Sequence, residues 1–260
     1  MIAAEIPDIE SFTFVDQAAY LTWHRGITHS FLFAPVMALT AVGLVWLFYR
    51  SIPWKKAYPL ALLAVIAHIS ADLLNTWGTG IWEPISQGRY SLGILPIVDI
   101  VILLIFAFAF IIRRQVQNKE RVFRWAGIAI LLYISLQAIQ GAILYGKLND
   151  TYDRVTLAAD FIPTQFQVIG QKGDTFHYYQ GTVYTGLEKK GKVVSQSHPA
   201  VNHALNDPTA KAIARFVPVF GAEVKEKENS YQVTIFDPRF RIRNPSLLST
   251  EVEVPKSSVK

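Results

Sequence analysis

Four long apolar runs limit what this chain can fold into. Each run is 19 to 21 residues long, and only Asp72 and Asp99 carry a formal charge within them. About 20 helical residues are needed to cross a hydrocarbon core of about 30 Å. We therefore predict a membrane-embedded all-α bundle of four transmembrane helices. The predicted helices cover residues 31–49, 57–75, 94–112 and 125–145.

Basic residues in the links between these runs predict how the bundle is oriented. The links 50–56 and 113–124 carry three and five Lys or Arg, whereas the first 30 residues are mainly acidic. Lys and Arg accumulate in cytoplasmic loops of membrane proteins. We therefore expect these two links in the cytoplasm. The N-terminal segment, the link 76–93 and everything after the fourth helix are expected outside.

The remainder of the chain, residues 146–260, has a different composition. It has ordinary charge and no 20-residue apolar run, which indicates a small, mostly β, α+β soluble domain. Asp207 followed by Pro208 is a typical helix start, so a helix is predicted over 209–216. Residues 245–260 are expected to form a loose tail, and Asp237-Pro238-Arg239 a turn with a surface ion pair. The predicted strands are 165–169, 176–185, 231–236 and 240–242.

Composition also excludes some kinds of chemistry. The chain has no cysteine, so disulfides, thiolate catalysis and Cys-based zinc sites are excluded. Much of the basic charge flanks the predicted spans, and we therefore expect the lipid bilayer as a partner and no nucleic acid.

Two short polar blocks stand at the margins of the apolar runs. The first is His24-Arg25-Gly26-Ile27-Thr28-His29-Ser30, and the second contains His68 and Asp72. Spacing of four residues puts His68 and Asp72 on one helix face, where they could chelate one metal ion. Gly26 permits a turn that brings His24 and His29 together. The predicted orientation places both blocks near the outer membrane face.

Each block also has a reading without metal. His68 and Asp72 could form a hydrogen-bonded pair inside a helical bundle, and the first block could lie at the depth of the lipid headgroups. Ionisable residues in a membrane segment nevertheless point to function, because burying them unpaired is costly. Two histidines with a His/Asp pair form a donor set that suits zinc, and manganese or iron would be acceptable.

Asp99 and Arg89 are the further candidates for catalysis. Asp99 could be an additional ligand, a partner that orients an imidazole, or a general base, or it could simply pair with Arg89. Arg89 could bind an anionic group such as phosphate, or contact lipid headgroups.

Several short motifs follow one another in a fixed order along the chain. They are Pro7-Asp8-Ile9-Glu10, Ala19-Tyr20, the block from His24 to Ser30, His68-x-x-x-Asp72, Arg89-Tyr90-x-Leu92 and Phe236-Asp237-Pro238-Arg239-Phe240. Together they resemble the bacterial family of membrane-bound metal-dependent hydrolases, the YdjM-like inner-membrane proteins, in its long form with a C-terminal domain.

This resemblance implies a multi-pass protein of the bacterial cytoplasmic membrane with metal-dependent hydrolase activity. The metal-site residues that it implies are His24, His29, His68, Asp72 and Asp8. The family usually has a second aspartate where this chain has Glu10. Its members usually also begin with an apolar helix that bears a histidine, so we expect a shortened N-terminus here.

Three functions are consistent with these patterns. The favoured one is hydrolysis of a phosphoester or another lipid-linked bond at the outer membrane face, by water activated at a divalent ion. The alternative is a non-enzymatic membrane scaffold or regulator that binds a protein through its C-terminal domain and has a structural His/Asp cluster. Transport is less favoured, because four helices offer little pathway.

Overall fold

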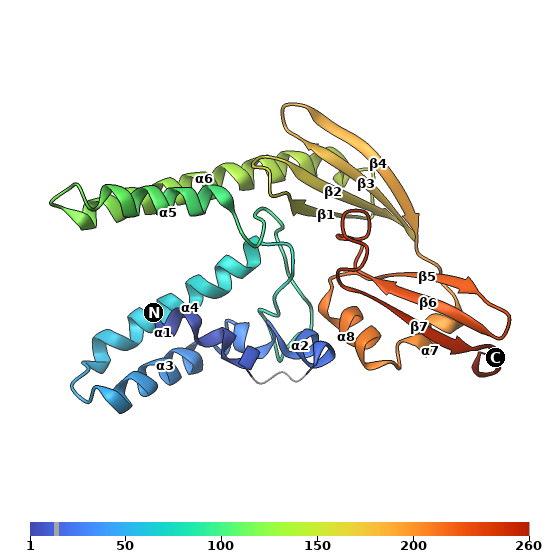
Figure 1. Cartoon of the computed structure of the whole chain (residues 1–260), viewed down its shortest axis with the longest axis horizontal. Coiled ribbons are helices and arrows are strands. Elements are labelled where there is room, and N and C mark those ends of the chain that lie inside the picture. The colour runs from blue at the N-terminus through green and yellow to red at the C-terminus, as the bar shows by residue number, and fades with distance from the viewer. Residues whose placement is uncertain (13–15, 260) are drawn as a thin grey trace. The chain divides into compact units, whose positions relative to one another are not determined.

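The computed structural model describes residues 1–12 and 16–259 (Figure 1). By internal packing the chain forms two units. Unit 1 combines Met1–Ser91 with Val194–Lys260, and unit 2 is Leu92–Val193. Each unit contains apolar helices and one β-sheet, and the boundary predicted between residues 145 and 146 stays a prediction.

The first part of unit 1 is helical. Its apolar core lies between α3 and α4 and includes Ala38, Val65 and Ile69, which are fully buried. Pro35 stands in the first turn of α3, a position where its missing N–H costs nothing. The elements are α1 (Ile2–Glu5), the 3-10 helix η1 (Ile6–Phe12), α2 (Gln17–Trp23), the 3-10 helix η2 (Ile27–His29), α3 (Ala34–Phe48) and α4 (Trp54–Leu74).

The second part of unit 1 is a three-stranded antiparallel sheet in the order β5-β6-β7, packed against two helices (Figure 1). Asp207 caps α8 by accepting hydrogen bonds from two backbone N–H groups, as predicted. Leu21 of α2 is buried in the same core as Ile213 and Phe216 of α8. The elements are α7 (Pro199–Ala204), α8 (Pro208–Phe216), β5 (Gly221–Glu226), β6 (Ser230–Phe236) and β7 (Ser249–Pro255).

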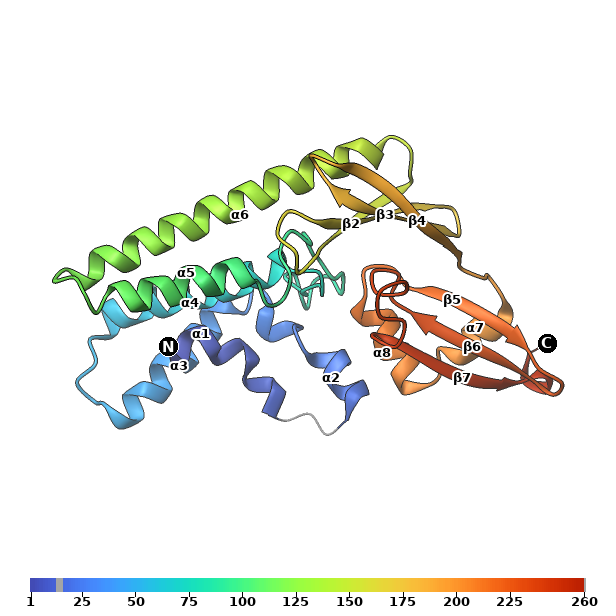
Figure 2. The same ribbon diagram turned by 45° about the horizontal axis from the view of Figure 1, so that its top comes forward.

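Unit 2 joins two apolar helices to a four-stranded antiparallel sheet in the order β1-β2-β3-β4. The two helices lie side by side (Figures 1 and 2). Leu144 near the C-terminal end of α6 packs against Leu157 and Phe166 of the sheet. The elements are α5 (Ile100–Ile112), α6 (Lys119–Asn149), β1 (Arg154–Ala159), β2 (Phe166–Lys172), β3 (Thr175–Thr182) and β4 (Gly186–Val194).

All four predicted apolar runs contain a helix, but the helices differ in length. Among the described residues, α4 and α6 are long and apolar enough to cross a membrane. A third span arises if Gln17–His29 and α3, which meet at a bend of 90°, are counted as one. The structure therefore supports two spans, or up to three, and the prediction of four is not confirmed.

The shortfall at α5 has a local cause. Pro96 has no N–H, and the residue before a proline disfavours the helical conformation. The Asp99 side chain then accepts hydrogen bonds from the N–H groups of Val101 and Ile102 and starts the helix at Ile100. With 13 residues, α5 is about 20 Å long, shorter than a hydrocarbon core.

Two expectations for the C-terminal segment also change. Residues 240–242, predicted as a strand, form turns, and residues 249–255, expected within a loose tail, form β7. The register of β7 on β6 places Val252 opposite Val233 and Val254 opposite Tyr231. Valine alternates with glutamate along β7, so one face of the strand can pack on the core. This alternation explains why the segment forms a strand.

Candidate metal centre

Three side chains from separate segments of unit 1 come together. Asp8 lies on η1, His29 at the end of η2, and His68 in the second half of α4. Nε2 of His29 is 3.1 Å from Oδ1 of Asp8 and 3.3 Å from Nε2 of His68, and His68 Nε2 is 3.6 Å from Oδ2 of Asp8. The hydrogen bond with His29 lowers the pKa of Asp8, although partial burial opposes it. Asp8 is therefore a carboxylate at neutral pH.

Asp72 joins this group one helical turn after His68. Its Oδ2 is 3.2 Å from Nε2 of His29 and 3.7 Å from Nε2 of His68. This oxygen is buried, and the imidazole nitrogens of His29 and His68 are the groups that face it. A buried carboxylate oxygen needs strong partners, and a cation among these atoms would supply one.

The donor atoms fit a divalent metal ion in number and spacing. One ligand atom each from Asp8, His29 and His68 lie within 4.8 Å of one another. Zinc binds imidazole nitrogen at about 2.0–2.1 Å, which sets tetrahedral ligand atoms about 3.3 Å apart. The distances from His29 Nε2 to its neighbours, 3.1 to 3.3 Å, agree with this spacing. One N–H of His29 could satisfy only one of these three neighbours, whereas one metal ion could bind Asp8 and His68 together with His29.

The other ring nitrogen of His29 meets a second layer of polar groups. Its Nδ1 is 3.1 Å from Thr28 Oγ1 and 3.6 Å from Glu10 Oε1. Glu10 also accepts hydrogen bonds from the backbone N–H of Arg25 and from the Thr28 hydroxyl. A carboxylate on the far nitrogen of a ligating histidine fixes the orientation of the ring. The structure therefore places Glu10 behind His29.

His24, the other histidine of the first block, contacts Glu10. Its Nδ1 is 3.4 Å from Glu10 Oε1, and its ring stacks on Tyr20 with the centroids 4.5 Å apart. The group of three candidate ligands formed by Asp8, His29 and His68 does not include it. The structure thus brings Asp8, His29 and His68 within metal-binding distance of one another, with Asp72 in contact with both histidines although outside that group, and it places His24 beside them.

Arg25 was not predicted as a site residue, yet it contacts Asp72 directly. Its Nη2 is 3.0 Å from Oδ1 of Asp72, and its Nη1 donates to Oδ1 of Asn75 at 2.9 Å. Its backbone has a φ of 57°, which is uncommon for a residue other than glycine. Such conformations occur at functional sites, where the surrounding contacts maintain them. The only sequence signal was its position between His24 and His29.

Arg89, predicted to bind an anionic group, is turned toward the protein interior. Its side chain is 0% exposed, and its Nη1 donates to the carbonyl oxygens of His24 and Arg25. Its Nη2 is 3.6 Å from Oε1 of Glu83. A Cβ on Gly80 would lie 2.9 Å from that same oxygen, so this glycine leaves room for the carboxylate. Arg89 and Glu83 therefore hold the loop that contains the first histidine block.

Asp99 lies in unit 2 and has local partners. Its Oδ1 caps α5, and its Oδ2 accepts a hydrogen bond of 2.8 Å from the hydroxyl of Tyr133 on α6. These contacts join α5 to α6. A catalytic role for Asp99 stays a prediction.

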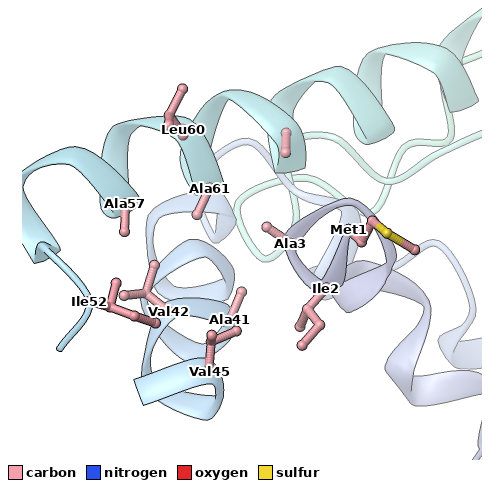
Figure 3. A pocket seen from close by; sticks show the side chains of 11 residues that line it. Met1, Ile2, Ala3, Ala41, Val42, Val45, Ile52, Ala57, Leu60 and Ala61 are labelled. Carbon is pink, nitrogen blue, oxygen red and sulfur yellow. The ribbon is translucent and has the colours of Figure 1, made fainter. Parts of the chain in front are cut away.

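The surroundings of the cluster differ on its two sides. His29 is 0% exposed, whereas the Asp8 side chain is 41% exposed, so Asp8 is on the exposed side of the cluster. A separate pocket of about 400 Å³ is lined by residues of α1, α3 and α4, including Ile2, Val42 and Ala61 (Figure 3). All of its lining residues are apolar, so it offers hydrocarbon contacts and no reactive group.

Comparison with known proteins agrees with the membrane character of the chain. YfhP of Bacillus subtilis (strain 168), an uncharacterized protein, is 23% identical over 250 residues, which cover 93% of this chain and 76% of the relative. No solved structure matches the chain. Residues 1–144 match the family model described as YdjM inner membrane protein. This match includes all the residues of the candidate metal centre, and the chain belongs to the YdjM inner membrane protein family.

Proposed function

We propose that the protein is a membrane-bound hydrolase that binds a divalent metal ion at Asp8, His29, His68 and Asp72. The observation that carries this proposal is that ligand atoms of Asp8, His29 and His68 lie within 4.8 Å of one another, with Oδ2 of Asp72 3.2 Å from Nε2 of His29. Zinc is the metal that this donor set favours, and manganese is the alternative. When bound, such an ion would act as a Lewis acid and make hydroxide available near neutral pH.

The protein residues would divide the remaining tasks. Glu10 orients the His29 ring through Nδ1, and Arg25 holds one oxygen of Asp72 so that the other faces the histidines. The exposed side of Asp8 gives the substrate access. Under the proposed orientation, with the segment after α6 outside the cytoplasm, the substrate is a phosphoester or another lipid-linked bond at the outer membrane face. Catalytic roles for Arg89 and Asp99 stay predictions from the sequence.

Metal content and hydrolysis test the proposal together. The full chain is purified in detergent, depleted of metal and reloaded with zinc or manganese, and activity is followed on bis(p-nitrophenyl) phosphate and on phospholipid vesicles. We expect about one ion per chain in the wild type, a loss of both metal and activity in His68→Ala, and neither loss in His203→Ala, which changes an exposed histidine. A wild type that binds no metal would overturn the proposal.

The same experiment separates hydrolysis from a structural role. The dense contacts among η1, η2 and α4 favour a scaffold as the second candidate, because the cluster ties three segments together. A scaffold would bind metal and lose thermal stability without it, but would hydrolyse neither substrate.

A further inference from the structure

Two charged residues of the C-terminal segment, Asp237 and Arg239, are buried next to each other. Asp237 is 0% exposed and Arg239 is 4% exposed. Nε of Arg239 is 3.0 Å from both carboxylate oxygens, and its Nη2 is 2.6 Å from Oδ2. The sequence predicted a surface ion pair here. The structure shows a buried one, which requires further partners for the guanidinium.

Those partners lie just beyond the end of α4. Nη1 of Arg239 donates to the carbonyl oxygen of Thr76, and Nη2 donates to that of Trp77 at 3.2 Å. Helix α4 ends at Leu74, so these carbonyls have no partner within the helix. A planar guanidinium can bind a carboxylate and two carbonyls at once, which a lysine ammonium cannot do in this geometry.

The segment that Arg239 holds is connected to the metal centre. Asn75 Oδ1 accepts hydrogen bonds from the Trp77 backbone N–H and from Arg25 Nη1, both at 2.9 Å. Arg25 in turn lies 3.0 Å from Oδ1 of Asp72. The other oxygen of Asp72 is then directed at His29 and His68. Each step in this series is a direct polar contact.

The C-terminal core also holds the segment that leads into the first histidine block. Leu21 of α2 is 2% exposed and packs with residues of α8. Trp77 packs on Phe216 of α8, with ring centroids 5.7 Å apart. The C-terminal segment thus contacts the helical part of unit 1 just before His24 and just after Asp72.

We propose that Arg239 is a positioning residue of the metal centre, and that the segment 194–260 is a structural part of that centre rather than a separate module. Only the part of this inference that concerns metal affinity rests on the proposed function. Arg239, fixed by Asp237, holds the turn at residues 75–77, and this turn holds Arg25 against Asp72.

Hydrogen exchange of the full chain in detergent, without metal, tests the positioning itself. In Arg239→Lys the backbone amides of residues 75–78 are expected to exchange about tenfold faster or more, since a charge-assisted hydrogen bond is lost. Arg241→Lys is the matched control, because Arg241 pairs with Glu223 in the same segment and is partly exposed. Exchange unchanged from wild type in Arg239→Lys would overturn the inference.

Zinc affinity tests the consequence for the site. Arg239→Lys and Asn75→Ala are each expected to weaken zinc binding about 10-fold or more, as changes to groups that orient ligands do. The double variant should lose little beyond either single one. Faster exchange with unchanged zinc affinity would overturn the positioning role. Losses of zinc affinity that add fully in the double variant would also overturn it. A wild type that binds no zinc would instead refute the proposed function, and the exchange result would still decide the link. If Arg239→Lys fails to fold, Asn75→Ala alone provides both measurements.

Discussion

Removing the Glu10 carboxylate gives a sharp prediction for both stability and metal binding. The side chain is 11% exposed and accepts hydrogen bonds from the Arg25 backbone N–H and the Thr28 hydroxyl. In Glu10→Ala both donors lose this acceptor, at a cost of about 1–3 kcal/mol each. We expect the metal-free protein to lose about 2–6 kcal/mol of unfolding free energy.

Metal affinity should fall in the same variant. Glu10 Oε1 lies 3.6 Å from Nδ1 of His29, and loss of a carboxylate that orients a ligating histidine typically weakens metal binding 10–100-fold, here taken as about 30-fold. Glu10→Gln keeps one acceptor oxygen, so its losses should be smaller. The assay pairs thermal unfolding of metal-free protein with zinc competition against a chromogenic chelator.

A matched control makes the result interpretable. Glu5 lies in α1 and is exposed, so Glu5→Ala should stay within about 0.5 kcal/mol of wild type and bind zinc equally. If Glu10→Ala unfolds at the wild-type temperature and binds zinc as tightly, Glu10 neither holds the loop nor orients His29, and the reasoning is refuted.

Two further predictions concern packing, and thermal unfolding measures both. Gly80→Ala should lower stability by about 1–3 kcal/mol, because a Cβ there would lie 2.9 Å from Glu83 Oε1, whereas Gly43→Ala, with nothing within 4 Å, should not. Leu21→Ala should cost about 2–5 kcal/mol, since this side chain is 2% exposed in the core shared with α8. A loss below about 1 kcal/mol for Leu21→Ala would contradict that packing.

The sequence predicted the apolar helices well because hydrophobic runs depend on local composition. It predicted their lengths less well. Pro96 and the capping Asp99 shorten the third helix to 13 residues, a local effect that a hydropathy run hides. The pairing of β7 with β6 depends on a core that forms far along the chain, so the last residues were mistaken for a tail.

The candidate site, like the fold, was predictable only where local sequence patterns determine it. His68 and Asp72 share a helix face by spacing alone, and the resemblance added Asp8. Glu10 and Arg25 acquire their roles through contacts with distant segments, as in the pair of Arg25 with Asp72, which are 47 residues apart, and no local pattern reveals these contacts.

The buried position of Arg239 differs most from the sequence prediction, which placed its ion pair with Asp237 at the surface. Its contacts with Thr76 and Trp77 span more than 160 residues. One signal was present, since Phe236 and Phe240 on either side of Asp237-Pro238-Arg239 favour burial. A buried Asp–Arg pair then requires further hydrogen-bond partners.

The most direct test of the metal centre is an anomalous difference map from crystals of the zinc-loaded full chain, recorded on both sides of the zinc absorption edge. The account predicts one peak about 2.0–2.1 Å from Nε2 of both His29 and His68, with carboxylate oxygens of Asp8 and Asp72 completing the site. No peak at these nitrogens, or a peak bound by other residues, would contradict it.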